Sequence, residues 1–174
     1  MNVRGLKPSA TLAINERSNA LRREGKAVFK LGLGQSPFPV PDNVVNALRH
    51  HAHEKDYLPV KGLPELREAV AEFHRRKDHV NACSDGVLIG PGSKELMFLM
   101  QLVYYGEILL PTPCWVSYGP QAKIIGRNVR LIETTYEERW RITAERMISY
   151  LEKEEDTYRP RLLILNYPGN PDGD

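Results

Sequence analysis

The chain has little of what marks several classes of protein. Its two cysteines, Cys83 and Cys114, form no CxxC pair and have no cysteine–histidine spacing typical of a zinc site. No apolar run reaches membrane-spanning length, and no stretch resembles a signal peptide. We therefore expect no metal site and no membrane partner, and we predict a reducing, cytoplasmic location.

An excess of charge of one sign is also lacking. The 24 basic and 22 acidic residues are interspersed and leave a formal net charge of +2. Because no basic stripe stands out, we expect no nucleic acid partner. Hydrophobic residues at 41% and charged residues at 26% match an ordinary folded domain, and 174 residues are enough for one hydrophobic core.

What the sequence does have is an alternation of apolar runs with amphipathic segments. Helices are expected at 9–26, from Asp42 to about His53, from Pro64, from Ser93, at 118–125 and at 143–154. Strands are expected at 28–34, 86–90, 107–111, 128–133 and 161–165. This order predicts an α/β fold, a mainly parallel sheet with helices on both faces.

Two of the expected helices have distinct patterns. The helix that starts at Pro64 places Leu66, Ala69, Val70 and Phe73 at i, i+3, i+4 and i+7, which predicts one apolar face. The helix from Ser93, SKELMFLMQLVYY, is apolar on most sides and is predicted to be buried.

Because ligands of open α/β sheets collect at the carboxyl ends of strands, the segments after each strand are the candidate sites. PGSK follows the expected strand 86–90, and its Gly92 lets backbone amides approach a ligand closely. A helix that begins at Ser93 would offer amides to a phosphate. Plain helix capping by Gly92 and Ser93 is the alternative.

Two further segments follow strands. In TPCWVSY, Trp115 would stack on a flat ligand ring or pack in a core or interface. In NYPGNPDGD, Asn170 carries an amide able to donate to a ligand oxygen, although Asn-Pro-x-Gly is more often a turn. Trp140 is expected to pack where a strand enters the helix near Thr143, and Cys114 to be a small buried thiol.

Five segments of the chain match motifs of a known protein family, and they occur in the order of that family: LGLGQSPFPVP, Tyr57 with GLPELREAVAEF, IGPGSKELM, PTPCWVSY and LNYPGNPDG. Together they resemble the pyridoxal-phosphate aminotransferases of fold type I, in the class I/II branch, from about Leu31 to Asp174. The resemblance implies transfer of an amino group between an amino acid and a 2-oxo acid. It also implies an N-terminal arm and helix at 1–30, for small-domain or dimer contact, and an incomplete cofactor-binding large domain at 31–174.

The resemblance further implies roles for individual residues. Gly34 is similar to the glycine whose backbone lies near the substrate carboxylate. Tyr57 is similar to the tyrosine that reaches the cofactor phosphate of the neighbouring subunit, which implies a homodimer. The remaining cofactor-binding positions are the phosphate turn, the ring-stacking aromatic and the asparagine at the phenolic oxygen: Gly92, Ser93, Lys94, Trp115 and Asn170.

The chain departs from the family in two places. Asn170-Pro171-Asp172-Gly173 stands where Asn-Pro-Thr-Gly is common, and YYGEILLP is one residue shorter than usual. The lysine that forms a Schiff base with pyridoxal phosphate lies, in the family, downstream of the asparagine loop, and neither Lys61 nor Lys94 is a convincing substitute. We therefore expect a truncated chain that does not transaminate alone.

Two other functions remain open at this point. A carbon–sulfur lyase of the same fold would carry the same motifs, and a non-catalytic module would bind phosphate or nucleotide at PGSK. His50 and His53 lie on one predicted helical face, but without a second cluster of ligands a solvated helix end is the better interpretation.

Overall fold

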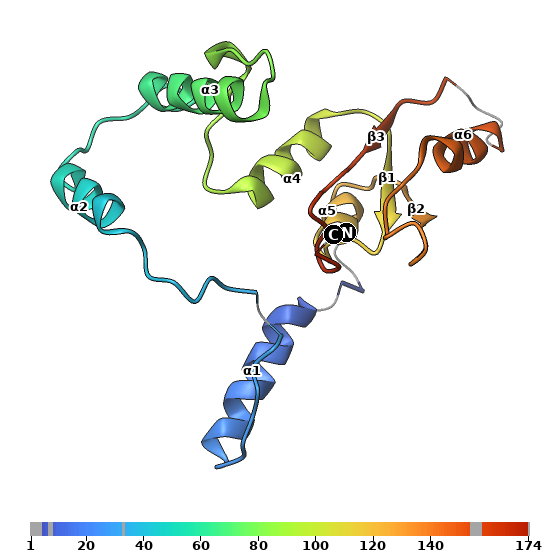
Figure 1. Ribbon diagram of the computed structural model, residues 1–174, viewed down its shortest axis with the longest axis horizontal. Helices are drawn as coiled ribbons and strands as arrows, with labels where there is room; N and C mark the ends of the chain where they lie inside the picture. Colours follow the sequence, from blue (N-terminus) through green and yellow to red (C-terminus); the bar gives the residue numbers. More distant parts are fainter. Residues whose placement is uncertain (1–4, 7–8, 33, 154–157, 174) are drawn as a thin grey trace. The chain divides into compact units, whose positions relative to one another are not determined.

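The computed structural model describes residues 5–6, 9–32, 34–153 and 158–173 (Figure 1). Its internal contacts divide the chain into two compact units. One consists of Met1–Gly32 with Met97–Asp174, and the other of Leu33–Leu96. All strands of the described chain lie in the first unit.

A three-stranded parallel sheet organises the first unit. Its central strand is β1 (Glu107–Thr112), flanked by β2 (Val129–Glu133) and β3 (Arg161–Leu163) in the order β2-β1-β3. Ile108 of β1 is in register with Val129 on one side and Leu162 on the other. Parallel neighbours need long crossover connections, and the helices α5 (Tyr118–Ile124) and α6 (Ala144–Glu152) occupy them. This confirms the predicted α/β class.

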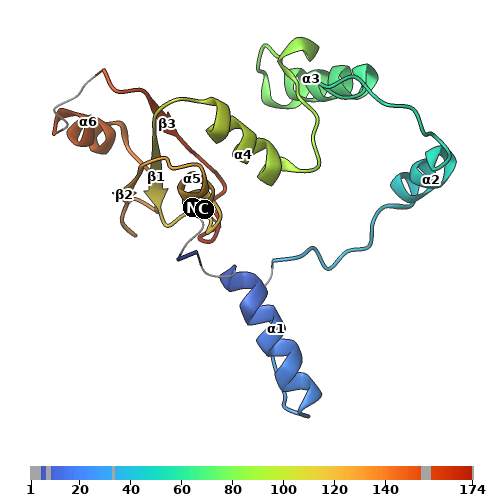
Figure 2. The same cartoon turned by 180° about the vertical axis from the view of Figure 1, so that it is seen from behind.

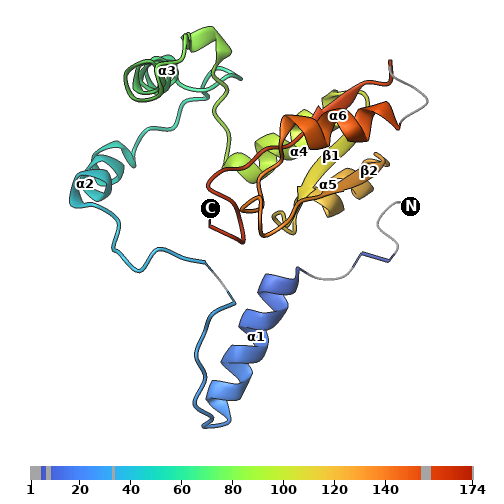
Figure 3. The same cartoon turned by 45° about the vertical axis from the view of Figure 1, so that its right-hand side comes forward.

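The core lies where β1 meets α5. Ile108 and Leu110 of β1 are buried against Tyr118 and Ala122 of α5. Leu109 is also buried, and the pleat of the strand turns it to the opposite face of the sheet. Figures 1 and 2 show α5 and α6 on opposite sides of β1, and Figure 3 shows α6 in front of the sheet. Helices therefore cover both faces, as predicted.

Two helices of this unit have recognisable ends. Thr143 precedes α6, and its hydroxyl accepts a hydrogen bond from the Arg146 amide at 3.2 Å, a standard N-cap. α1 (Ala10–Arg23) is followed, after Glu24, by Gly25, which adopts a φ of +79° while its amide donates to the Arg22 carbonyl at 3.0 Å. Both boundaries agree with the sequence to within a few residues.

The second unit contains the helices α2 (Asp42–His51) and α3 (Pro64–Asp78) and a short 3-10 turn, η1 (Ser84–Gly86). Arg67 joins α3 to this turn: its guanidinium donates to the backbone carbonyls of Ser84 and Val87. Of the predicted apolar face of α3, Leu66, Ala69 and Phe73 are exposed and Val70 is half-buried, whereas the buried residue of this helix, Ala71, lies outside that face.

Two predicted strands are wrong. Neither the described residues of 28–34 nor residues 86–90 form a strand in the described chain. An extended segment is stable as a strand only when a neighbour pairs with its amides and carbonyls. In segment 86–90 the Ile89 amide donates to the Lys61 carbonyl at 3.0 Å. Lys61 lies in a loop and does not belong to a neighbouring strand.

The predicted burial of α4 (Ser93–Val103) is also wrong. Gln101 is its buried residue, whereas Leu99, Met100, Leu102 and Val103 are exposed. The side-chain amide nitrogen of the buried Gln101 donates to the Gln121 side-chain oxygen of α5 at 3.0 Å, while the Gln101 side-chain oxygen has no hydrogen-bond partner among the described residues.

Candidate active site

A pocket lies at the carboxyl ends of β1 and β3. It brings together two residues that the sequence singled out, Trp115 after β1 and Asn170 after β3. The rest of its lining combines aromatic, aliphatic and polar residues and includes Pro113, Cys114, Tyr118, Trp140, Ile164, Leu165, Asn166, Tyr167 and Asp172. Parallel strands place their carboxyl ends at one edge of the sheet, so segments far apart in sequence meet here.

Trp115 forms part of both the pocket and the core. Its indole packs against the core cluster and meets the Tyr118 ring edge-on, with the ring centres 5.4 Å apart and an interplanar angle of 81°. The core role and the ligand-facing role that the sequence left open are therefore compatible. A ring anchored in this way presents its pocket side in a defined orientation.

Asn170 lies on a tight turn in the segment that follows β3. The Gly173 amide donates to the Gly169 carbonyl at 3.0 Å, which closes the turn around Asn170. A Cβ at Gly169 would meet only the Asp172 carboxylate, which is the end of a side chain and can move aside. Asn170 itself is exposed and lines the pocket, so its amide is accessible to a ligand.

The PGSK turn lies in the other unit and has the backbone of a helix start. Gly92 has a φ of +107°, a conformation that L-residues rarely adopt, and no atom lies within 4 Å of the place where a Cβ would be. The Gly92 carbonyl accepts a hydrogen bond from the Glu95 amide at 3.2 Å. Gly92, and not Ser93, is therefore the N-cap residue of the helix that begins at Ser93. Gly92, Ser93 and Lys94 are all exposed.

The other two predicted site residues, Gly34 and Tyr57, lie in the same unit as this turn and are exposed. Tyr57 is fully exposed. Of the seven predicted positions, Trp115 and Asn170 share one pocket and Gly92, Ser93 and Lys94 share one turn.

Comparison with known proteins identifies the family. The model of aminotransferase class I and II matches residues 26–174. The chain belongs to this family. It is 32% identical to an aspartate aminotransferase of Bacillus sp. (strain YM-2) and 34% identical to an aspartate/prephenate aminotransferase of Thermus thermophilus, in each case over 98% of this chain and 44% of the relative.

Solved aminotransferase structures are similar over the same extent. The aspartate aminotransferase of Rhizobium meliloti matches with a TM-score of 0.85 and 30% identity over 98% of this chain and 42% of that one. The Thermus thermophilus aspartate aminotransferase with maleate matches with a TM-score of 0.85 and 32% identity over 98% and 44%. The chain therefore spans less than half the length of these aminotransferases.

Sequence reasoning missed three aromatic residues that line the pocket of this aminotransferase-family chain: Tyr118, Trp140 and Tyr167. The Tyr167 hydroxyl accepts a hydrogen bond from the Ile142 amide at 3.0 Å and thereby joins the asparagine turn to the loop before α6. Trp140, predicted only as a packing residue, adopts a φ of +55° on that loop. Tyr118 and Tyr167 stand inside the family motifs, which was the available signal.

Burial changes the acidity of two of the lining groups. It raises the pKa of the Cys114 thiol, so the thiol form is favoured at neutral pH and oxidation is disfavoured. Burial, together with the neighbouring Cys114, also raises the pKa of the Tyr118 phenol. Both groups therefore act as neutral walls of the pocket.

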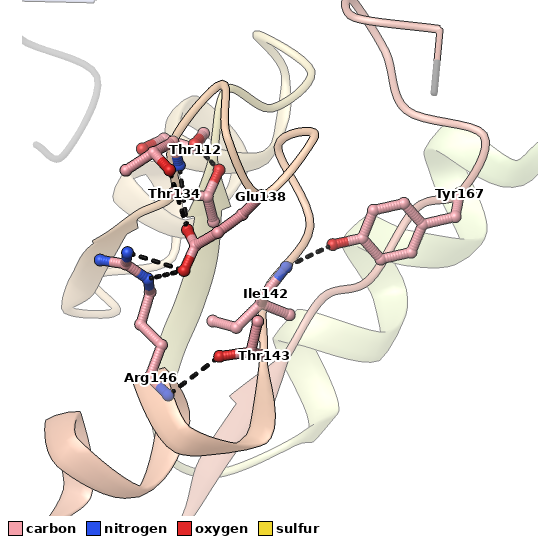
Figure 4. A network of polar contacts seen from close by, with 8 residues as sticks. Thr112, Thr134, Glu138, Ile142, Thr143, Arg146 and Tyr167 are labelled. Atoms are coloured by element: carbon pink, nitrogen blue, oxygen red, sulfur yellow. Dashed lines mark hydrogen bonds and ion pairs between the residues drawn. The ribbon is translucent and has the colours of Figure 1, made fainter.

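A polar network holds the loop that carries Trp140 (Figure 4). The Arg146 guanidinium donates to the Glu138 carboxylate at 2.8 Å, and the Thr135 amide donates to the same carboxylate at 3.1 Å. The Thr134 hydroxyl donates to the Thr112 carbonyl at the end of β1 at 2.7 Å. Hydrogen bonds therefore connect the segment from Thr134 to Ile142 with β1, with α6 and with Tyr167.

This network predicts a pH dependence of stability. The hydrogen bond from Arg146 lowers the pKa of the Glu138 carboxyl from its ordinary value of 4.5. Because the pKa of Glu138 is lower in the folded than in the unfolded state, its ionised form stabilises the fold at any pH above the unfolded-state pKa. This stabilisation is lost as the pH falls through the folded-state pKa. Between about pH 7 and about pH 3, wild-type Tm should therefore fall further than that of Glu138→Gln.

The matched control is Glu145→Gln, the same change at an exposed glutamate in the first turn of α6. Its Tm should follow the wild-type pH profile. Equal losses of Tm in wild type and Glu138→Gln would contradict the assigned role of the ion pair.

Within the described residues, no group of three or more histidine, cysteine, aspartate or glutamate side chains has the arrangement of a metal site. His53 is exposed and its ring contacts the Glu54 carboxylate at 3.7 Å. Within the described ranges of the chain, no helix has the length and apolar character needed to cross a membrane.

Proposed function

We propose that this protein acts as a pyridoxal 5'-phosphate-dependent aminotransferase that moves an amino group between an amino acid and a 2-oxo acid. The observation that carries the proposal is the shared pocket of Trp115 and Asn170 at the carboxyl ends of β1 and β3. Membership of the aminotransferase class I and II family supports it. Because relatives are named aspartate aminotransferases, aspartate is the first amino acid to test.

The chemical groups of Trp115, Asn170 and the Gly92 turn suit the parts of pyridoxal phosphate. An indole face suits a pyridine ring, and an exposed amide suits an ionised phenolic oxygen. The exposed Gly92 turn at the start of α4 suits a phosphate, since the first amides of a helix have no intrahelical acceptor. The pocket beside Trp115 encloses only about 20 Å³, so a ring reaches it from the open side or after its walls part.

The protein's part in the proposed reaction is to bind and orient. Pyridoxal phosphate, when bound, supplies an electron sink for a carbanion next to the ring. Trp115 would hold the plane of the ring, and Asn170 would donate to its phenolic oxygen. Ser93 and the backbone of Gly92 and Lys94 would hold the phosphate, and Gly34 would leave its backbone open to the substrate carboxylate.

We also propose a homodimer in the cytoplasm, with Tyr57 donating to the phosphate held by a partner subunit. The full exposure of Tyr57 is compatible with such a contact. In this arrangement residues 1–30 form an arm for dimer or small-domain contact, and residues 31–174 belong to the cofactor-binding domain.

Cofactor binding is tested by titration with pyridoxal phosphate and, as a matched ligand without phosphate, pyridoxal. Both tryptophans of the chain line the pocket, so binding should quench their fluorescence saturably. Ser93→Ala should weaken binding of the phosphate form about fivefold, the loss of one hydrogen bond, and leave pyridoxal unaffected. Absence of saturable binding would refute the proposed function.

We further propose that these 174 residues do not transaminate by themselves. No lysine lines the pocket among the described residues. Borohydride reduction of the cofactor complex followed by peptide mapping should therefore leave the lysines unlabelled, and no aspartate-dependent formation of a 2-oxo acid should occur. A single modified lysine together with turnover would overturn this proposal.

Two other activities are outcomes of the same assays. Release of ammonia and a keto acid without amino transfer would identify a carbon–sulfur lyase or a related enzyme. Binding of nucleotide without affinity for pyridoxal phosphate would identify a non-catalytic phosphate-binding module.

A further inference from the structure

The pocket beside Trp115 contains one charged side chain in its wall. Among the described residues that line it, Asp172 is the only acid, and none is a lysine, an arginine or a histidine. Arg139 and Arg141 flank Trp140 in sequence, but neither lines the pocket. A ligand in this pocket therefore meets one negative charge and no basic side chain in the described wall.

The Asp172 carboxylate belongs to the same turn as Asn170. The hydrogen bond from the Gly173 amide to the Gly169 carbonyl, at 3.0 Å, closes this turn. Asp172 is half-buried, and its carboxylate lies beside the place that a Cβ of Gly169 would occupy. Gly169, Asn170 and Asp172 all line the pocket. One turn of the chain thus presents both a neutral amide and a negative charge to a ligand.

Pyridoxal phosphate and its amine form, pyridoxamine phosphate, differ in one group. The aldehyde of pyridoxal phosphate carries no charge, whereas the amine of pyridoxamine phosphate is an ammonium at neutral pH. In both compounds this group is attached to the ring carbon next to the one that carries the phenolic oxygen. If Asn170 donates to that oxygen, as proposed above, the aldehyde or the ammonium lies near the turn that carries Asp172.

We propose that Asp172 makes the pocket select the amine form of the cofactor. The Asp172 carboxylate attracts the ammonium of pyridoxamine phosphate, and it exerts no such attraction on an uncharged aldehyde. Opposite charges a few ångströms apart at a partly solvated site change an affinity about tenfold. Asp172 is therefore a specificity-determining residue. The selection rests on the proposed aminotransferase function, because that function supplies the ligand.

The charge at this position is a feature of the chain itself. Asn170-Pro171-Asp172-Gly173 stands where Asn-Pro-Thr-Gly is common in the family. A threonine at the third position carries no charge and would not distinguish an ammonium from an aldehyde. Membership of the family therefore does not imply this selection.

The test is titration of the chain with two ligands that cannot form a Schiff base with a lysine. Pyridoxamine phosphate carries the ammonium, and 4'-deoxypyridoxine phosphate carries a hydrogen in place of its amino group, with the same ring, phenolic oxygen and phosphate. Quenching of tryptophan fluorescence reports the binding of both, because Trp115 and Trp140 line the pocket. The wild-type chain should bind pyridoxamine phosphate about tenfold more tightly than the deoxy ligand.

Variants assign the preference to the Asp172 charge. Asp172→Thr removes the charge and should reduce the preference to within about twofold, through weaker binding of pyridoxamine phosphate. Asp172→Glu keeps the charge and should retain a preference, which separates the effect of charge from that of a changed turn. Circular dichroism melts show whether each variant is folded.

The matched control is Glu133→Gln, which removes one negative charge from an exposed residue at the carboxyl end of β2. Glu133 lies at the same edge of the sheet as the pocket but does not line it. Its replacement should leave the preference for pyridoxamine phosphate within about twofold of the wild-type value.

Several results would overturn the selection by Asp172. Equal affinities of the wild-type chain for the two ligands would mean that the Asp172 charge does not act on the bound ring. A preference that persists in folded Asp172→Thr would come from another group, and one lost equally in Glu133→Gln would come from the general charge of this edge. A preference lost in both Asp172→Thr and Asp172→Glu would come from the shape of the turn. In each case the ring still binds and the proposed function stands, whereas binding of neither ligand would refute both.

Discussion

Replacing Gly106 by alanine is expected to destabilise the protein by about 2–4 kcal/mol. Gly106 has a φ of +143°, and an added Cβ would lie 2.8 Å from the Pro160 carbonyl carbon and would also collide with the carbonyl oxygen. The same oxygen accepts from the Glu107 amide at 3.0 Å, at the first contact between β1 and β3. The substitution therefore strains the backbone and displaces a hydrogen bond of the sheet.

Urea unfolding with matched m-values measures this loss. Gly119→Ala is the control, because Gly119 lies inside α5, has no atom within 4 Å of the added Cβ and should gain up to about 1 kcal/mol from helix propensity. If both variants unfold at the wild-type urea midpoint, the close approach of Gly106 and Pro160 does not set the β1–β3 register.

Asn170→Asp is expected to weaken pyridoxal phosphate binding about 100-fold. The change removes an amide donor and places a negative charge where the proposed ligand carries an ionised phenolic oxygen. A hydrogen bond to a charged group contributes about 1.5–3 kcal/mol, and each 1.4 kcal/mol is tenfold in affinity. Because Asn170 is exposed, Tm should stay at its wild-type value.

The control for this variant is Asn128→Asp, which adds the same charge at the amino-terminal ends of the strands. Its affinity for pyridoxal phosphate should remain within about twofold of wild type, since the added charge is more than a Debye length away. Equal affinities of Asn170→Asp and wild type would remove Asn170 from the proposed site without affecting Trp115.

Helices were the part of the fold that local sequence predicted best. Pro64 marks the first turn of α3, Thr143 caps α6, and Gly25 follows the end of α1 in the left-handed conformation. Each signal acts through the residue's own backbone or side chain within one turn of the helix. Helix boundaries therefore follow from a few neighbouring residues.

Strands were predicted less well, because a strand needs a partner. Segments 107–112, 129–133 and 161–163 pair with one another and form the sheet. Segment 86–90 is as apolar as these, yet its Ile89 amide bonds to the loop carbonyl of Lys61. Apolar character indicates that a segment can be a strand, and pairing decides whether it is one.

In the candidate site, too, some residues were predicted from the sequence and others were found only in the structure. Trp115 and Asn170 were predicted because each follows a strand, and the topology of a parallel sheet brings such segments to one edge. Trp140 and Tyr167 were missed as pocket residues, because the bond from the Ile142 amide to the Tyr167 hydroxyl joins loops 25 residues apart in sequence.

The sequence by itself determined the alternation of helices and strands, the helix caps and the motifs that resemble aminotransferases, because propensity, capping and motif spacing act over short stretches of chain. Only the tertiary structure decided which apolar segments pair as strands, which aromatic residues line the pocket, and which polar atoms of the described residues are buried. Those properties depend on contacts between residues far apart in the chain, whose geometry exists only once the sheet has formed.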